Sequence, residues 1–117
     1  MPPDQLMTAD TAYLCAGVNG IRENEGNEIS WRTNVDGTIA VVKLLPGAFV
    51  VYLSSNAVEW SDTSYARQRA AVESFLHARG RAAIVRVQKV TKDNVAQFVL
   101  FLVKIGQKQR DGVYHWP

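Results

Sequence analysis

The sequence predicts one α/β domain with helices on the faces of a central sheet, and three observations support this class. Residues 48–55 (AFVVYLSS) form a short apolar run without a polar face, which is typical of a strand covered on both sides. The chain between Ser64 and Gly80 carries apolar side chains at helical spacing. Residues 81–90 then return to a strand pattern. We take residues 48–55 as the central strand.

The length of 117 residues corresponds to one domain, 1–117, with residues 1–4 as a loose start and residues 106–117 as a C-terminal tail. No run approaches the roughly 20 apolar residues of a membrane span, and the first residues do not have the pattern of a signal peptide. The single Cys15 cannot form an internal disulfide, which fits a reducing compartment. We therefore expect a cytoplasmic protein that does not enter membranes.

Before the central strand, the pattern predicts a helix at 5–18 and two further strands. Residues 28–33 alternate between apolar and polar side chains, and residues 38–45 are rich in β-branched residues. Asp36-Gly37 between them is the strongest local turn signal. Together with residues 48–55, these segments would form a three-strand meander.

After the central strand, the period changes to that of a helix. Residues 61–64 (SDTS) offer several N-caps, and Gly80 is the natural stop. The apolar side of this helix is expected to carry Tyr65, Val72, Phe75 and Leu76, and the polar side Arg67, Glu73, Ser74 and His77.

Two more strands, 81–90 and 95–105, would form a hairpin around a turn at 91–94, and the latter is apolar on both faces from Phe98 to Val103. The order is therefore helix, three-strand meander, helix, two-strand hairpin, around a central mixed sheet. One amphipathic helix cannot cover both faces of such a sheet, so the N-terminal helix, a partner subunit or both must cover the other. We expect a homo-oligomer, with a homodimer through the sheet or the last strand as the simplest case.

The charges are unevenly placed along the chain. Residues 1–60 contain seven acids and three bases, a net charge of −4, whereas residues 61–117 contain four acids and ten bases, a net charge of +6. Such asymmetry is typical of proteins with an anionic partner. It is equally consistent with two halves that neutralise each other on one folded surface.

The basic residues around the second helix are the candidate nucleic-acid-binding residues, because Lys and Arg neutralise phosphates and release counterions. They are Arg67, Arg69, Arg79, Arg81, Arg86, Lys89 and Lys92. The alternative is that these side chains only solvate a helix face. Tyr114 and Trp116 could stack on bases, but we favour packing of Trp116 onto the sheet.

After the central strand come a helix with Gln68 near its start, Gly80, and a strand of small and β-branched residues, Ala82 to Val87. In this order, the stretch from Gly47 to Val90 resembles the PD-(D/E)XK nuclease superfamily, in particular archaeal Holliday-junction resolvases and the virus-type replication-repair nuclease domain. The resemblance extends over roughly residues 5–104 and implies a restriction-endonuclease-like fold.

The catalytic motif of that superfamily is not retained. The Glu and Lys of its Glu-x-Lys motif fall on Leu53 and Ser55, and its preceding acidic ligand would fall near Ala40. A nuclease of this class needs two carboxylates on a divalent cation and a Lys that positions the attacking water. The resemblance therefore implies no catalytic residue, no bound metal and no cofactor.

The leading functional hypothesis is a nuclease-like protein without catalysis that binds DNA or RNA through its basic C-terminal half. The first alternative is a protein-interaction module, such as an inhibitor, an adaptor or a structural subunit. The second is an active metal-dependent endonuclease, in which Asp36 with Glu28, or Glu59, would form a displaced Mg²⁺ site.

Other catalytic chemistry has little support in the sequence. Cys15 lacks any flanking signature of a thiol nucleophile. His77 is expected on the polar face of a helix, and His115 lies in an aromatic tail.

Overall fold

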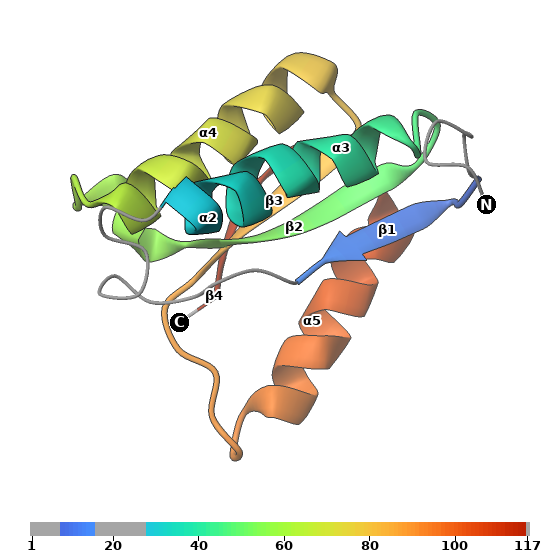
Figure 1. Cartoon of the computed structure of the whole chain (residues 1–117). Coiled ribbons are helices and arrows are strands. Elements are labelled where there is room, and N and C mark those ends of the chain that lie inside the picture. Colours follow the sequence, from blue (N-terminus) through green and yellow to red (C-terminus); the bar gives the residue numbers. More distant parts are fainter. Residues whose placement is uncertain (1–7, 16–27, 117) are drawn as a thin grey trace.

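A four-stranded sheet forms the centre of the computed structural model, which describes residues 8–15 and 28–116 (Figure 1). Its strands lie in the order β1 (Thr11–Leu14), β2 (Phe49–Ser55), β3 (Ala82–Val87) and β4 (Gly112–Trp116). Every neighbouring pair is parallel, with Thr11 opposite Phe49, Val50 opposite Ala82, and Ala83 opposite Gly112. The prediction of a mixed sheet is therefore wrong, whereas the α/β class is confirmed.

Strand β2 is the central strand, as the sequence predicts. Phe49, Val50, Val51 and Tyr52 are almost fully buried, and Leu53 alone among its seven residues is half-buried. A strand covered on both faces needs apolar residues at consecutive positions. This is the pattern that residues 48–55 show.

Residues 28–43 form one helical segment, made of α2 (Glu28–Trp31), the π-helical η1 (Arg32–Gly37) and α3 (Thr38–Lys43). The predicted strands at 28–33 and 38–45 are wrong. Ser30, Asn34 and Val42 are buried at intervals that fit a helix, and Gly37 adopts a helical φ of −64° instead of a turn. Strands β1 and β2 are parallel, so the chain between them must cross over, and a helix is the usual crossover.

Helix α4 (Ser64–Arg79) agrees closely with the prediction. Its N-cap is Thr63, whose hydroxyl oxygen accepts a hydrogen bond of 3.3 Å from the backbone nitrogen of Ala66. It ends at Gly80, which has a φ of 80° that favours glycine. Val72 and Leu76 are fully buried against the sheet. Glu73, expected on the polar side, is buried as well.

The segment 95–105, predicted as a strand, lies in helix α5 (Val95–Lys108). Phe98, Leu102 and Ile105 are buried at helical intervals of four and three residues. The predicted tail 106–117 contains the end of this helix and strand β4. Of the helix predicted at 5–18, residues 11–14 form β1, and the rest that the structure describes, residues 8–10 and 15, is not helical. Residues 1–4 lie outside the described part of the chain.

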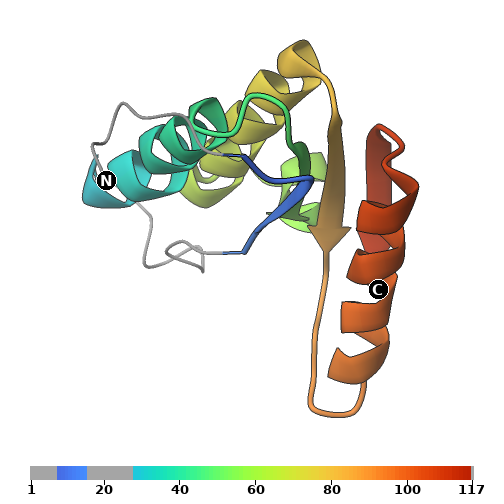
Figure 2. The same cartoon turned by 90° about the vertical axis from the view of Figure 1, so that its right-hand side faces the viewer.

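The helices lie on both faces of the sheet (Figures 1 and 2). The α4 face is covered by α3 and α4, and its core contains Val35, Val42, Val50, Tyr52, Val72, Leu76, Ala82 and Ile84. Among the residues that the structure describes, α5 alone covers the α5 face. The core of this face contains Phe49, Val51, Ala83, Val85, Phe98, Leu102 and Ile105. The sequence analysis required a second element to cover the other face of the sheet, and α5 of the same chain covers it.

The crossover from β3 to β4 has the opposite hand to the two before it. The strand order advances in one direction, but α5 lies on the other face, so this connection is left-handed and the first two are right-handed (Figure 2). About 98% of such crossovers are right-handed, so specific contacts must hold β4 in place. Trp116 packs against Phe98 and Phe101, and the Asp111 carboxylate accepts a 3.0 Å bond from the backbone nitrogen of Arg81.

Within the described residues, no helix has the length and apolar character needed to cross a membrane.

Candidate functional site

A crevice opens at the carboxyl ends of β2 and β3. From β2 the chain turns towards α4 on one face, and from β3 it turns towards α5 on the other. In parallel α/β sheets, ligands bind at such a point, because the diverging loops leave a gap outside the strand ends. The gap here is a cavity of about 490 Å³. It is lined by Cys15, Leu53, Ser54, Ser55, Tyr65, Arg69, Val87, Gln88, Val90 and Phe98.

Arg69 places a fixed positive charge in the wall of this crevice. It is only 5% exposed, and its Nη1 donates to the Tyr52 hydroxyl at 3.1 Å and to the Leu53 carbonyl at 3.3 Å. Its guanidinium carbon also lies 5.3 Å from the centre of the Tyr65 ring. Burial raises the pKa of Tyr52, so this phenol is neutral at pH 7 and does not neutralise Arg69.

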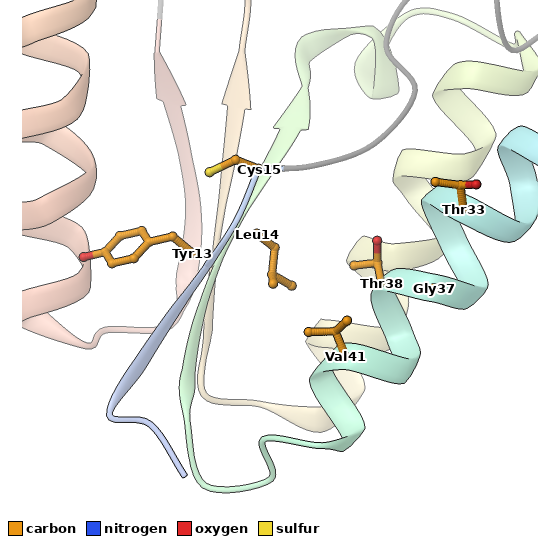
Figure 3. Close-up of a pocket in the computed structure, with 7 residues that line it drawn as sticks. All are labelled: Tyr13, Leu14, Cys15, Thr33, Gly37, Thr38 and Val41. Carbon is orange, nitrogen blue, oxygen red and sulfur yellow. The ribbon is translucent and has the colours of Figure 1, made fainter. Parts of the chain in front are cut away.

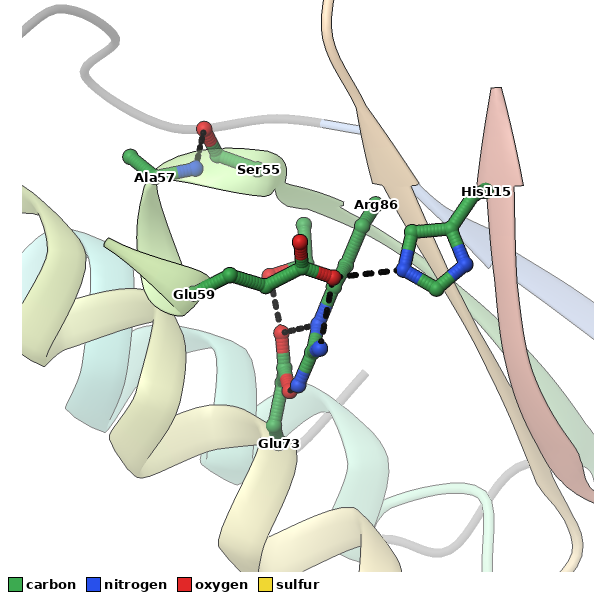
Figure 4. A network of polar contacts seen from close by, with 7 residues as sticks. Ser55, Ala57, Glu59, Glu73, Arg86 and His115 are labelled. Carbon is green, nitrogen blue, oxygen red and sulfur yellow. Dashed lines mark hydrogen bonds and ion pairs between the residues drawn. The ribbon is translucent and has the colours of Figure 1, made fainter. Parts of the chain in front are cut away.

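A second polar network lies beside the crevice and joins five elements (Figure 4). Ser54 at the end of β2 donates to Glu73 of α4 at 2.5 Å, and Arg86 of β3 donates to both oxygens of Glu73 at 2.7 and 3.3 Å. Arg86 also donates to Glu59 of η2 (Asn56–Glu59) at 3.1 Å. The His115 imidazole of β4 lies 2.6 Å from the same Glu59 oxygen.

This network acts as a brace between strands and helices. Arg86 occupies both oxygens of the Glu73 carboxylate, so Ser54 lacks the unengaged base that a serine nucleophile needs. His115 bonds to Glu59, not to Ser54. Hydrogen bonds from His115 and then Arg86 lower the pKa of Glu59 and so favour its ionised form.

The structure places the predicted nucleic-acid-binding residues at both edges of the sheet. At the carboxyl edge, Arg67, Lys89 and Lys92 are exposed, Arg69 lies in the crevice wall and Arg86 belongs to the brace. The exposed Arg67 pairs with Asp62 at 3.5 Å. Because Arg67 lies at the start of α4 and Lys89 and Lys92 follow β3, five of the seven residues lie on the carboxyl side of the sheet.

Arg79 and Arg81 lie at the opposite, amino edge. Arg79 donates to the backbone oxygens of Leu45 at 3.0 Å and Ala48 at 2.8 Å. Arg81 donates to the backbone oxygen of Gly47 at 3.0 Å. These bonds tie the turn before β2 to the turn before β3, which is a structural role.

The positions onto which the resemblance to nucleases would place the Glu-x-Lys motif also lie at the carboxyl end of β2. Leu53 lines the crevice, and the Ser55 hydroxyl accepts a 3.1 Å bond from the backbone nitrogen of Ala57, which caps η2. For the displaced metal site, Asp36 is exposed on η1 and Glu59 belongs to the brace. In the described ranges 8–15 and 28–116, no group of three or more His, Cys, Asp or Glu side chains could hold a metal ion.

A further cavity, of about 470 Å³, lies between β1 and the helical segment 28–43 (Figure 3). The described residues that line it are Tyr13, Leu14, Cys15, Thr33, Gly37, Thr38 and Val41. None of these carries a charge that would recognise an ionic ligand. We therefore place the candidate site at the carboxyl edge, where Arg69 and the serines converge.

Two features of this site are absent from the sequence-based prediction. In the sequence, Ser54 and Ser55 were interpreted only as a polar break after the central strand, and Glu73 as a solvent-exposed residue of the helix. The signal that identifies them is the parallel pairing of β2 and β3, because polar residues at the carboxyl end of a parallel strand face the ligand-binding edge.

The fold and the crevice define a parallel α/β domain with a polar site at the carboxyl edge of its sheet. No model of a known protein family matches the chain, and no curated protein matches it. The resemblance to PD-(D/E)XK nucleases stays a prediction.

Proposed function

We propose that this protein binds nucleic acid through the carboxyl edge of its sheet and does not cleave it. The observation that carries the proposal is the crevice at the carboxyl edge, whose wall contains Arg69. Arg67 at the start of α4 and Lys89 and Lys92 on the segment after β3 add exposed positive charge on the same side of the sheet. Exposed Lys and Arg side chains neutralise phosphates, and a buried cation in a polar crevice adds a fixed point of attraction. The absence of cleavage rests on Leu53 and Ser55, which replace the Glu and Lys of the nuclease motif.

The crevice favours a single strand over a duplex. Its volume of about 490 Å³ lies in the range of small-molecule sites, and so it suits one nucleotide unit rather than a double helix. Ser54 and Ser55 add hydroxyl groups to its wall, and Tyr65 adds an aromatic ring. In this proposal, the exposed cations hold the phosphate backbone, while one unstacked nucleotide enters the crevice.

The test is the affinity for a labelled single strand of about 20 nucleotides and for its duplex, measured by fluorescence anisotropy across a salt series. We expect the single strand to bind more tightly and the affinity to fall steeply with salt. Lys89→Glu/Lys92→Glu should weaken binding more than about tenfold and reduce the salt slope by about two. Recovered strands should be intact in the presence of Mn²⁺.

The matched control is Lys43→Glu/Lys108→Glu, which makes the same change of net charge with exposed lysines at the other end of the molecule. It should change the affinity less than about threefold, because charges beyond the Debye length of roughly 10 Å are screened. Equal losses in the two double variants would mean that only net charge matters, which contradicts the proposed site. No binding at low salt would overturn the proposal.

A free nucleotide presents the same phosphate and base to the crevice as a nucleic acid strand does. A competition experiment distinguishes a free nucleotide from a nucleic acid strand as the ligand of the crevice. A mononucleotide that displaces the strand at micromolar concentration would assign the crevice to a small ligand. Displacement only by other strands supports the polymer.

A further inference from the structure

The two walls of the carboxyl-edge crevice differ in their chemistry. The wall on the α4 side carries polar groups, and its residues are Ser54, Tyr65 and Arg69. The wall on the α5 side is apolar, and its residues are Leu53, Val87, Val90 and Phe98. A ligand in the crevice therefore meets a polar surface on one side and an apolar surface on the other.

The alternation of side chains along the strands produces this difference. Ser54 of β2 points to the α4 face of the sheet, where it donates a hydrogen bond to Glu73 of α4. Leu53 and Val87 point to the opposite face and pack against its apolar core. The segment after β3 continues the apolar wall with Val90, which is 39% exposed.

The polar wall is positively charged. Its charge is that of Arg69, and the Tyr65 ring belongs to the same wall because its centre lies 5.3 Å from the Arg69 guanidinium carbon. Lys89 and Lys92 follow β3 and add exposed positive charge on the same side of the sheet. A ligand that fits both walls combines an anionic group with an apolar surface. A nucleotide has both, because its phosphate is charged and its base has an apolar face.

We propose that the crevice orients one nucleotide of a bound strand, with its base against the apolar wall at Val90 and its phosphate towards Arg69. This inference rests on the proposed nucleic-acid binding and adds how the strand is held. Contact with the face of a base is tolerant of sequence, because every base has such a face. Binding then depends on the bases as well as on the phosphates.

The test compares a single strand of about 20 nucleotides with a strand of equal length made only of abasic tetrahydrofuran units. Both strands carry the same phosphates, so their affinities should show the same dependence on salt. We expect the abasic strand to bind at least about tenfold more weakly, because it lacks the contact with the apolar wall. Fluorescence anisotropy at low salt measures both affinities.

Substitution of Val90 tests the position of the base. Val90→Ser removes apolar surface at a partly exposed position, and it should weaken the intact strand about three- to fivefold and leave the abasic strand unchanged. Val90→Trp should strengthen only the intact strand, by about threefold, because it adds a stacking surface. Val41→Ser is the matched control: Val41 is 44% exposed on α3, outside the crevice lining, and both affinities should stay unchanged.

Substitution of Arg69 tests the position of the phosphate. Arg69→Gln, with its fold checked by circular dichroism, should weaken both strands by the same factor, because both retain their phosphates. Unchanged affinities in this variant would overturn the assignment of the phosphate. For a variant that loses its fold, Lys89→Glu/Lys92→Glu provides the same comparison, and it too should weaken both strands equally.

The outcomes separate this inference from the proposed function. Equal affinities of the intact and abasic strands would overturn the base contact and leave the proposed function in place, since the phosphates alone would then explain binding. An equal loss for both strands in Val90→Ser would overturn the base contact as well. Failure of both strands to bind at low salt would overturn the proposed function itself.

Discussion

The two faces of the sheet are built differently. The α4 face is covered by two helical segments, and its core contains directional polar contacts: Gln68 accepts a 2.7 Å bond from Asn34 and donates a 3.1 Å bond to Ser30, all three buried. The α5 face is covered by one helix, and its buried cluster is made of apolar and aromatic side chains. Directional bonds specify one helix position, whereas apolar contacts alone leave several close alternatives.

On the α4 face, directional hydrogen bonds between side chains fix the position of the helices. On the α5 face, the burial of apolar side chains holds the helix against the sheet. The α4 face contains the two right-handed crossovers, and the α5 face contains the left-handed one. The exposed Val99 and Leu100 of α5 also belong to the face with fewer directional contacts. We expect changes in the α4 face to affect stability more strongly than equivalent changes in the α5 face.

The largest expected effect is that of Leu76→Ala in the α4 face. Leu76 is fully buried between α4 and the sheet, so its truncation should lower the free energy of unfolding by about 4 kcal/mol. The matched change in the α5 face, Leu102→Ala, should cost about 2 kcal/mol, because a single covering helix can relax into the cavity. Urea denaturation followed by circular dichroism measures both. Equal losses would remove the distinction between the faces.

A smaller effect is expected for the buried polar contact of the α4 face. Gln68→Ala removes these two hydrogen bonds together with a longer one of 3.5 Å to Ser64, and should cost about 2 kcal/mol. A double-mutant cycle with Asn34→Ala isolates their interaction, for which we expect about 1 kcal/mol of coupling. Coupling near zero would show that directional bonding does not distinguish this face.

The smallest effect concerns the bond that ties β4 to η2. Hydrogen bonds from His115 and Arg86 lower the pKa of Glu59 below its ordinary value of 4.5. The folded state thus favours the ionised carboxylate. The stability it contributes is present above the unfolded pKa and is lost as the pH falls through the lower folded pKa.

The measurement is the urea midpoint between pH 6 and pH 3. Glu59→Gln should show a weaker loss of stability below about pH 4.5 than the unchanged chain, by a small amount because Glu59 is exposed. Asp62→Asn serves as the control for removal of an exposed carboxylate. A pH profile unchanged by Glu59→Gln would mean that this bond does not hold β4.

Local patterns predicted some elements well. The consecutive apolar residues of β2, the cap at Thr63 and the stop at Gly80 are confirmed, because each depends on a few neighbouring residues. The carboxyl-edge crevice was not predicted. It arises where the loops after β2 and β3 diverge, and it therefore depends on which face each following helix covers.

The two segments that were wrongly predicted as strands differ from the prediction for one physical reason. Residues 28–43 carry alternating and β-branched residues that favour strands, and within 95–105 the run from Phe98 to Val103 is apolar without a break. Both become helices because the parallel strands that they connect require a crossover. In α5 the exposed Val99, Leu100 and Val103 extend the apolar side chains beyond the buried face, so the run from Phe98 to Val103 resembles a strand that is apolar on both faces.

The sequence by itself determined the α/β class, the central strand β2 and the extent of α4, because these depend on local periodicity and capping. Only the tertiary structure decided that the sheet is parallel, that residues 28–43 and 95–108 are helical, and which basic side chains reach the carboxyl edge. Strand pairing is non-local. A pairing between residues tens of positions apart sets each connection, and that connection overrides the weaker local preference of the chain.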